Sequence, residues 1–354
     1  MDNSEIIITG DTCGRDLVVP VIHFNGRDAT APKVYMQAAL HADELPGTAT
    51  LHFLCQKLRQ AEAENRIAGD ITLVPHANPV GAGQILYKQL QGRFDISSGI
   101  NFNRDFPLIA LSERQTLLNP TTPQTAISAL KNNLLFMALG ADIVIDLHCD
   151  FESLLYTYMC GVFWPDATDF AAAMGLHSVL FSDGQSTAFE EAVGFAFQHD
   201  DNVNSPRRFV TTLELRGQSD VDERLAKADA DGLFNFLTGR GVITSGQSDQ
   251  SDKTQPSWNG HVAPLDNIEV VCTPKSGTIL FNRSLGEEVK TGDLLATIIT
   301  SPGHDNGTYE ITAPQDGVII TRTFNRLAAQ SDPLYKILCQ APSTTARPPG
   351  ALES

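Results

Sequence analysis

The feature that most constrains the fold is a short apolar run at residues 141–147, ADIVIDL, of the kind that forms a buried strand. A similar run, VYMQAAL, covers residues 34–40. Between the two, residues 51–65 (LHFLCQKLRQAEAEN) carry apolar side chains at helical spacing. Strands that alternate with helices are typical of α/β proteins, in which helices cover a central sheet. We therefore expect an α/β domain over residues 1–244.

The character of the chain changes after residue 244. Residues 245–260 concentrate Ser, Gln, Asp and Gly without apolar periodicity, which indicates a linker. Beyond the linker, the segment TPKSGTI at 273–279 recurs 40 positions later as APQDGVI at 313–319. An internal repeat of this kind predicts two similar half-units.

The repeated region, residues 261–340, resembles a small all-β barrel sandwich of the biotinyl/lipoyl carrier type. In such carriers the modified lysine lies on the hairpin between the two halves, but the corresponding stretch here, SPGHDNGTYE at 301–310, contains no lysine. We therefore expect a structural or gating module instead of a swinging arm. The last residues, 341–354, are expected to be disordered.

Composition and charge exclude several classes of protein. Of the 354 residues, 42% are hydrophobic and 19% are charged, as in an ordinary folded protein. Subtracting 42 Asp and Glu from 25 Lys and Arg gives a net charge of −17, which repels nucleic acids and anionic membranes. The six cysteines are scattered without a CxxC pair, so we expect neither a disulfide scaffold nor a cysteine-type zinc site.

The N-terminal sequence MDNSEIIITG shows no pattern of a signal or transit peptide. No uncharged apolar stretch approaches the roughly 20 residues of a membrane span. We therefore expect a cytoplasmic protein. The sequence leaves the oligomeric state open, a homo-oligomer included.

Three residues at predicted strand ends offer metal ligands. His41 and Glu44 follow the first apolar run in a His-x-x-Glu spacing, and His148 ends the run IVIDLH, where open α/β sheets hold their ligands. Together they supply two nitrogens and a carboxylate, which leaves one position of a tetrahedral zinc ion open for water. The alternative is a surface turn with a helix-start acid at Glu44 and a structural histidine at 148.

Further candidates follow the pattern of amide hydrolysis. Water activated by zinc needs a base that does not itself bind the metal, and Glu214 ends another β-like run, TTLELRG. The glycine-rich stretch 92–107 holds Arg93, Asn103 and Arg104, of which one arginine can grip a carboxylate and a second can polarise a carbonyl. The alternatives are a solvated strand residue at 214 and a loop held by surface ion pairs.

The chain resembles the succinylglutamate desuccinylase/aspartoacylase group within the wider zinc-carboxypeptidase fold. The matching pieces occur in the family's order and are His41-x-x-Glu44, Asn78-Pro79, Gly92-Arg93, Asn101-Phe102-Asn103-Arg104-x-Phe106-Pro107, Asp146-Leu147-His148 and Leu213-Glu214. The resemblance implies a mixed central sheet flanked by helices and one zinc ion per chain. It also implies that His41, Glu44 and His148 bind the zinc ion and that Glu214 is the general base and later the proton donor. By the same resemblance, Arg93 polarises the carbonyl, and Asn103 with Arg104 binds a substrate carboxylate.

Two acids near His148 carry weaker hypotheses. Asp146 precedes His148 by two residues and therefore faces the same side of the strand, where it could hold the imidazole. Asp150, with Glu152 close behind, stands where better-known relatives have no acid and could favour a substrate with a cationic or amino group. The alternative is that Asp150 and Glu152 both face solvent.

The leading functional hypothesis is a zinc-dependent amidohydrolase, in which a zinc-activated water removes a short acyl group from the nitrogen of a small amino acid or related amine. A metallocarboxypeptidase that acts on a C-terminal peptide residue is the nearest alternative, and ester hydrolysis uses similar chemistry. An alternative of another class is an inactive small-molecule binding protein on the same fold. It is disfavoured because a degenerate site would be expected to lose at least one of His41, Glu44, His148 and Glu214.

Overall fold

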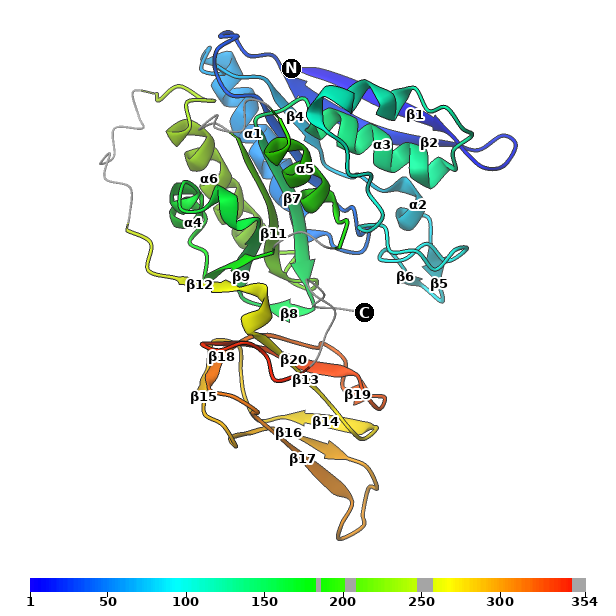
Figure 1. The fold of residues 1–354 in the computed structure, drawn as a ribbon, viewed down its shortest axis with the longest axis vertical. Coiled ribbons are helices and arrows are strands. Elements are labelled where there is room, and N and C mark those ends of the chain that lie inside the picture. The colour runs from blue at the N-terminus through cyan, green and yellow to red at the C-terminus, as the bar shows by residue number, and fades with distance from the viewer. Residues whose placement is uncertain (183–185, 201–207, 247–256, 346–354) are drawn as a thin grey trace.

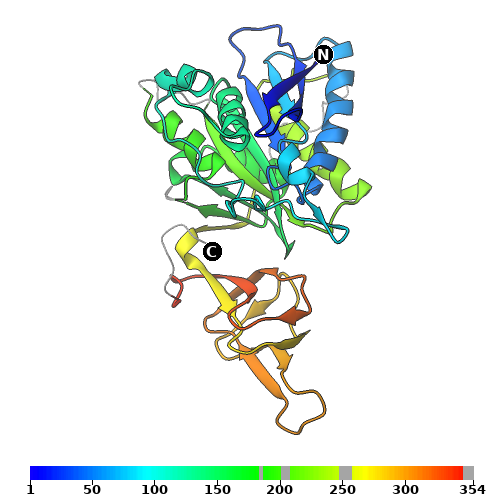
Figure 2. The ribbon, with the colours of Figure 1, turned by 90° about the vertical axis from the view of Figure 1, so that its right-hand side faces the viewer.

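The computed structural model describes residues 1–182, 186–200, 208–246 and 257–345. These residues form an α/β body that holds the N-terminal two thirds of the chain and a smaller body of β-strands below it (Figures 1 and 2). Among the helices in the described ranges, none has the length and apolar character needed to cross a membrane. The predicted linker lies outside these ranges at 247–256, and the predicted tail does so from residue 346 onward.

A nine-stranded mixed sheet forms the centre of the α/β body, in the order β1-β2-β4-β3-β7-β11-β9-β10-β12. Its four middle strands, β4, β3, β7 and β11, run parallel, whereas β9 pairs with β11 in the antiparallel sense. The strands are β1 (Asp2–Thr9), β2 (Asp16–Phe24), β3 (Val34–Ala38), β4 (Ile71–Val74), β7 (Ile143–Asp150), β9 (Leu155–Met159), β10 (Ser178–Phe181), β11 (Phe209–Gly217) and β12 (His261–Pro264). The two predicted strands correspond to β3 and β7.

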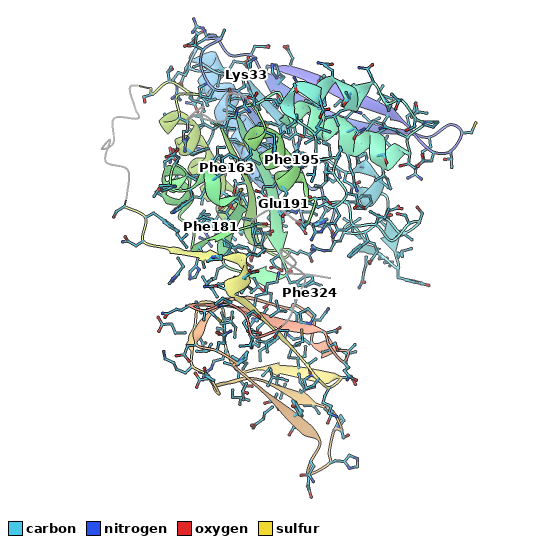
Figure 3. All side chains as sticks on the ribbon, viewed as in Figure 1. Lys33, Phe163, Phe181, Glu191, Phe195 and Phe324 are labelled. Atoms are coloured by element: carbon cyan, nitrogen blue, oxygen red, sulfur yellow. The ribbon has the colours of Figure 1, made fainter. Side chains whose placement is uncertain are left out.

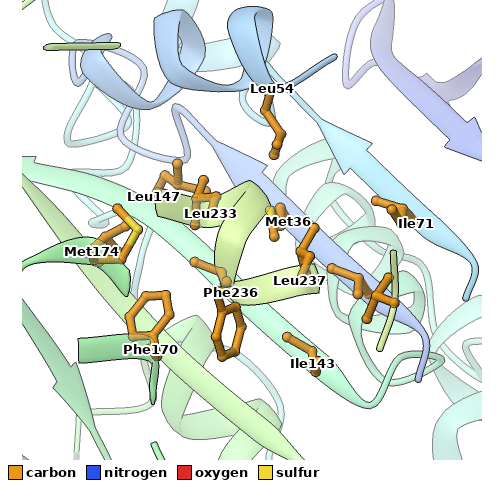
Figure 4. Packing of buried hydrophobic residues seen from close by; sticks show 14 of the residues in the cluster. Met36, Leu54, Ile71, Ile143, Leu147, Phe170, Met174, Leu233, Phe236 and Leu237 are labelled. Atoms are coloured by element: carbon orange, nitrogen blue, oxygen red, sulfur yellow. The ribbon is translucent and has the colours of Figure 1, made fainter. Parts of the chain in front are cut away.

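Helices cover both faces of the sheet (Figure 1). One face packs against α1 (Pro46–Ala63), α4 (Thr168–Met174) and α6 (Glu223–Gly239), and the other against α3 (Ala126–Ala138) and α5 (Phe189–Gln198). Strand β7 is buried on both sides. Ile143, Ile145 and Leu147 pack into the first core, on the face covered by α1, α4 and α6, and Val144 packs into the second core, on the face covered by α3 and α5. Figure 4 shows the first core, where Leu233, Phe236 and Leu237 of α6 meet Ile143 and Leu147. The predicted helix at 51–65 is α1.

Shorter elements connect these layers. They are α2 (Pro79–Ala82), a hairpin of β5 (Ile85–Leu86) and β6 (Gln89–Leu90), and three 3-10 turns at Leu111–Leu118, Gly161–Phe163 and Leu265–Asn267. From β4 the chain passes through α2 and the β5–β6 hairpin to the glycine-rich stretch that follows residue 90.

The C-terminal body consists of two antiparallel sheets around one apolar core. One has the order β13-β20-β18-β15 and the other β17-β16-β14-β19. The internal repeat appears as one strand in each sheet, because β14 starts at Gly277 and β18 at Gly317. The strands are β13 (Ile268–Cys272), β14 (Gly277–Phe281), β15 (Glu288–Val289), β16 (Leu294–Ile299), β17 (Thr308–Thr312), β18 (Gly317–Arg322), β19 (Leu327–Ala328) and β20 (Pro333–Cys339).

The two bodies are joined by strand pairing as well as by the chain. The short β8 (Glu152–Ser153), which directly follows β7, pairs with β18 of the C-terminal body. Residues 261–264 form β12, which pairs with β10 of the large sheet, so the C-terminal sheets begin at Ile268 and not at residue 261 as expected. At the other end, Thr344 and Thr345 of the expected tail donate hydrogen bonds to Glu269.

Candidate active site

The candidate residues gather at the carboxyl ends of the parallel strands, the edge where such sheets bind ligands. His41 and Glu44 lie in the turn between β3 and α1, and this turn begins at Ala39, whose φ of 55° lies in the left-handed region. His148 lies near the end of β7, and Glu214 of β11 is its partner in the sheet register. The fold therefore brings together residues separated by more than 100 positions.

A glycine allows the arginine-bearing loop to approach this turn. A Cβ on Gly92 would lie 2.1 Å from the Asp43 backbone nitrogen, so no larger residue fits without a shift of the main chain. The Gly92 carbonyl accepts a hydrogen bond of 3.0 Å from the Ala42 N–H. Arg93 is thereby placed against the His41–Glu44 turn.

Potential metal-ligating atoms of His41, Glu44 and His148 all lie within 4.8 Å of one another, and the three residues are buried. His41 Nδ1 is 2.8 Å from Glu44 Oε1, and His148 Nδ1 is 2.8 Å from Glu44 Oε2. The two imidazole rings meet edge to face, with centroids 4.9 Å apart. The carboxylate thus lies between two ring nitrogens, as the His-x-x-Glu and strand-end pattern predicts.

The outer nitrogen of each imidazole faces an oxygen acceptor. His148 Nε2 lies 2.9 Å from Asp146 Oδ2, and His41 Nε2 lies 2.8 Å from Asn101 Oδ1. A proton on each Nε2 leaves the Nδ1 lone pairs directed at Glu44, the orientation that outer partners impose on metal-binding histidines. The Asp146 contact agrees with the sequence hypothesis, whereas the Asn101 contact had no signal beyond its place in the family motif.

Electrostatics differ between the two histidines. Burial lowers the pKa of His41, and Arg93 acts in the same direction against the opposing effect of Glu44. Burial also lowers the pKa of His148, but Asp146 and Glu44 reverse this effect and raise the pKa well above the ordinary value. Burial raises the pKa of Glu44, yet the two histidines hold it well below the ordinary range.

Arg93 lies beside this group. Its Nη1 donates to Glu44 Oε1 at 3.1 Å and lies 3.4 Å from His41 Nδ1. A guanidinium at this position places a fixed positive charge at the edge of the metal-ligating group.

Glu214 is nine-tenths buried, and its Oε2 has no hydrogen-bond partner among the described residues. Burial, together with Glu44 and Asp150, raises the pKa of Glu214 to about 8, although His148 and Lys336 oppose the shift. A buried carboxyl with an unused oxygen and a pKa near neutrality can exchange a proton with a bound reactant.

Asn103 and Arg104 line the same pocket. Asn103 Oδ1 accepts a hydrogen bond of 2.8 Å from the Phe189 N–H at the start of α5. The buried Lys131 donates to the Arg104 carbonyl at 2.7 Å and so fixes the backbone of this loop. All seven predicted site residues therefore face one cavity.

The cavity is completed by residues that the sequence did not single out. Tyr156, Tyr158 and Glu190 come from the α/β body, whereas Leu265 and Lys336 come from beyond residue 260. They carry no local signal, because their proximity depends on how the two bodies pack. Figure 3 labels Glu191, another residue that lines the pocket, at the start of α5. It also labels Phe324 at the junction of the two bodies, where the centroid of its ring lies 5.3 Å from that of Phe151.

Asp150 is buried and Glu152 is half-buried in ion pairs, contrary to the alternative that both acids face solvent. Asp150 is buried in the pocket wall and accepts hydrogen bonds from Tyr156 at 2.9 Å and Lys336 at 2.6 Å. Glu152 pairs with Arg322 and Arg326 of the C-terminal body. The charge of Asp150 is thus balanced by Lys336, which removes the main reason to expect a substrate cation at this acid.

Two solved structures from Shewanella resemble the chain over nearly its whole length. A protein of Shewanella frigidimarina NCIMB 400 assigned to the succinylglutamate desuccinylase/aspartoacylase group is 28% identical, with 96% of this chain and 97% of that chain covered and a TM-score of 0.81. A family protein of Shewanella amazonensis SB2B is 26% identical, with coverages of 96% and 99% and a TM-score of 0.83. The product-bound ectoine utilization protein EutE (DoeB) of Ruegeria pomeroyi shares the fold at 19% identity, with coverages of 95% and 94% and a TM-score of 0.70.

No match was found among the curated proteins. The model of the succinylglutamate desuccinylase/aspartoacylase catalytic domain matches residues 30–240, a range that contains all the predicted site residues. This match covers more than half of the 354 residues. The chain therefore belongs to the succinylglutamate desuccinylase/aspartoacylase family, whose members are deacylases.

Proposed function

We propose that the protein is a zinc-dependent deacylase that hydrolyses the amide bond of a small N-acyl amino acid or a related N-acyl amine. The observation that carries this proposal is the convergence of His41, Glu44 and His148 in one pocket with Glu214, whose Oε2 has no hydrogen-bond partner in the part of the chain that the structure describes. Membership of a deacylase family supports the reaction class.

The ligand set fits one zinc ion per chain. Two imidazole lone pairs directed at a carboxylate 2.8 Å away repel it unless protons or a cation lie between them. Two nitrogens and a carboxylate are also a donor set that catalytic zinc accepts. A zinc ion held there supplies a Lewis acid that polarises a carbonyl and lowers the pKa of water towards neutrality.

We assign the proton transfers to Glu214. Its carboxylate accepts a proton from the water that attacks the amide carbon, and it then donates that proton to the nitrogen of the leaving amine. The C–N bond breaks as the N–H bond forms, so Glu214 returns to its starting state. Burial supports this assignment because it brings the pKa of Glu214 close to the pH at which both directions of transfer are accessible.

We assign charge stabilisation and substrate orientation to the loop after residue 90. Arg93 stabilises the negative charge that develops on the carbonyl oxygen, since its guanidinium lies beside the metal-ligating group. Arg104 and Asn103 bind a substrate carboxylate, for which a guanidinium provides two parallel donors. The Lys131 contact supports this role because it holds the Arg104 backbone in place.

The C-terminal body favours small substrates over peptides. Leu265 and Lys336 line the same cavity as the metal-ligating group, so the segment beyond residue 260 closes one side of the site. We propose a division into a catalytic domain and a C-terminal barrel-sandwich module that starts at Ile268 and acts as this wall.

The test combines a metal assay of the purified protein with a release screen over N-acetyl, N-formyl and N-succinyl amino acids. We expect about one zinc per chain and amine release that stops on chelation and returns when zinc is added. Metal-loaded protein that releases no amine from any of these amides would falsify the deacylase proposal. Cleavage of peptides alone would favour a carboxypeptidase.

A further inference from the structure

Three carboxyl groups line the pocket besides Glu44 and Glu214, and they differ in how they are satisfied. They belong to Asp150, Glu190 and Glu191. Asp150 uses both oxygens, since Oδ1 accepts from the Phe151 N–H and Oδ2 from Tyr156 and Lys336. This acid therefore has its partners inside the protein.

Glu191 is satisfied in the same way. Its Oε1 accepts a hydrogen bond of 2.9 Å from the Ser182 hydroxyl. Its Oε2 accepts from the Ser186 N–H at 2.6 Å and from the Ser186 hydroxyl at 2.8 Å. Glu191 thus serves to hold the chain around the start of α5.

Glu190 is different. It lies in the first turn of α5 and is only 3% exposed, yet its Oε1 has no hydrogen-bond partner in the described structure. A buried polar atom without a partner is costly, and native proteins satisfy such atoms with protein groups, water or a ligand. Glu190 therefore keeps an acceptor for a group that enters the pocket.

The neighbours of Glu190 indicate which part of a substrate would reach it. The preceding residue, Phe189, donates its N–H to Asn103 Oδ1 at 2.8 Å, and Asn103 adjoins Arg104. Glu190 also lines the same pocket as Asn103 and Arg104, the residues that we assign to the substrate carboxylate. A ligand that carries an anion and a cation a few bonds apart would match Arg104 and Glu190 together.

We infer that Glu190 binds an ammonium group of the substrate, so that the enzyme acts on N-acyl diamino acids. The inference rests on the proposed deacylase function and adds the class of amine. The free ammonium group could be the α-amino group of a side-chain amide or the side-chain amino group of an α-amide. Both sources present the same cation to Glu190.

The pKa of Glu190 bears on its role as a binding site for an ammonium group. Burial raises the pKa of Glu190 well above the ordinary value, and Glu191 and Asp146 act in the same direction, against the opposing effect of a hydrogen bond with the Cys160 backbone. A bound ammonium group favours the charged carboxylate and therefore opposes this shift. The competing role, a neutral carboxyl that donates to an uncharged group, gives no preference for a cationic substrate.

The experiment compares substrates that differ only in the ammonium group, using zinc-loaded full-length protein. One pair is Nα-acetylornithine and Nα-acetylnorvaline, and the other is Nδ-acetylornithine and 5-acetamidopentanoate. We expect kcat/KM to favour the ammonium-bearing member of one pair by about 10- to 100-fold, the range of a charge-assisted hydrogen bond. The pair that shows the preference identifies the source of the cation.

Variants then locate the preference. In Glu190→Gln the ratio within that pair should fall to about one, whereas the neighbouring Glu191→Gln should keep it, because both variants remove one carboxylate from the same turn. If Glu190→Gln does not fold, inhibition of the wild type by free ornithine and norvaline replaces it, and ornithine should bind more tightly by a similar factor.

Equal turnover within both pairs, or a preference that survives in Glu190→Gln, would overturn the inference and leave the deacylase function intact. Failure of the zinc-loaded wild type to cleave any of these or the other N-acyl amino acids would instead remove the deacylase proposal, and the inference with it.

Discussion

Replacement of Lys336 by Met should strongly destabilise the folded chain, because it leaves a buried carboxylate without its cation. Lys336 Nζ lies 2.6 Å from Asp150 Oδ2, and the two side chains are 8% and 4% exposed. Water and salt screen such a pair poorly, and the removal of one partner of a buried ion pair typically costs about 3–5 kcal/mol. Tyr156 still donates to Asp150 after the change, so we expect the lower half of that range.

The pair also joins the two bodies, since Lys336 lies on β20 and Asp150 on β7. Urea unfolding, followed by circular dichroism, measures the loss of stability. The double variant Asp150→Asn with Lys336→Met removes both charges and should recover more than half of the loss. Lys290→Met is the control, because its pair with Asp316 is exposed and should contribute nothing measurable. A Lys336→Met protein as stable as the wild type would refute the reasoning.

Three further predictions concern the site. Glu214→Gln should keep its zinc but lower kcat by about 10²–10⁴-fold, the usual effect of a lost general base, and loss of the metal in this variant would make Glu214 a ligand instead. Arg104→Ala should chiefly raise KM for carboxylate-bearing substrates, because this contact acts in the ground state and the transition state alike, and an unchanged KM would remove the carboxylate requirement. Burial raises the pKa of Glu190, so this group stabilises the ligand-free protein at low pH and loses that contribution as pH rises towards its folded-state pKa. Glu190→Gln should therefore lose less stability than the wild type between pH 5 and 8, and equal slopes of unfolding free energy against pH would contradict the buried state of this carboxyl.

The local pattern of apolar residues was sufficient to predict the central strands of the sheet and one of the helices that cover it. The apolar runs at 34–40 and 141–147 became β3 and β7, and the helical spacing at 51–65 became part of α1. The two strands are buried along their length and the helix buries one face, so the spacing of their apolar side chains predicts each type of element. The strand at 261–264 was missed because it is an edge strand whose pairing with β10 depends on distant residues.

The internal repeat predicted two similar half-units, and the two copies supply equivalent strands to different sheets, β14 to one C-terminal sheet and β18 to the other. Nothing in the repeat indicated that β18 would also pair with β8 of the α/β body. That contact forms between segments about 170 residues apart, so no local pattern could have predicted it.

By itself, the sequence predicted the group of His41, Glu44 and His148 that could hold a metal, because these residues lie at the ends of strands whose carboxyl ends meet at one edge of a parallel sheet. Only the tertiary structure decided the surroundings of that group. Lys336 neutralises Asp150 across 186 positions of chain, and Glu190 is left with an unused oxygen in the same cavity. Charge balance and burial are properties of how distant segments pack, so no local pattern of residues could have predicted them.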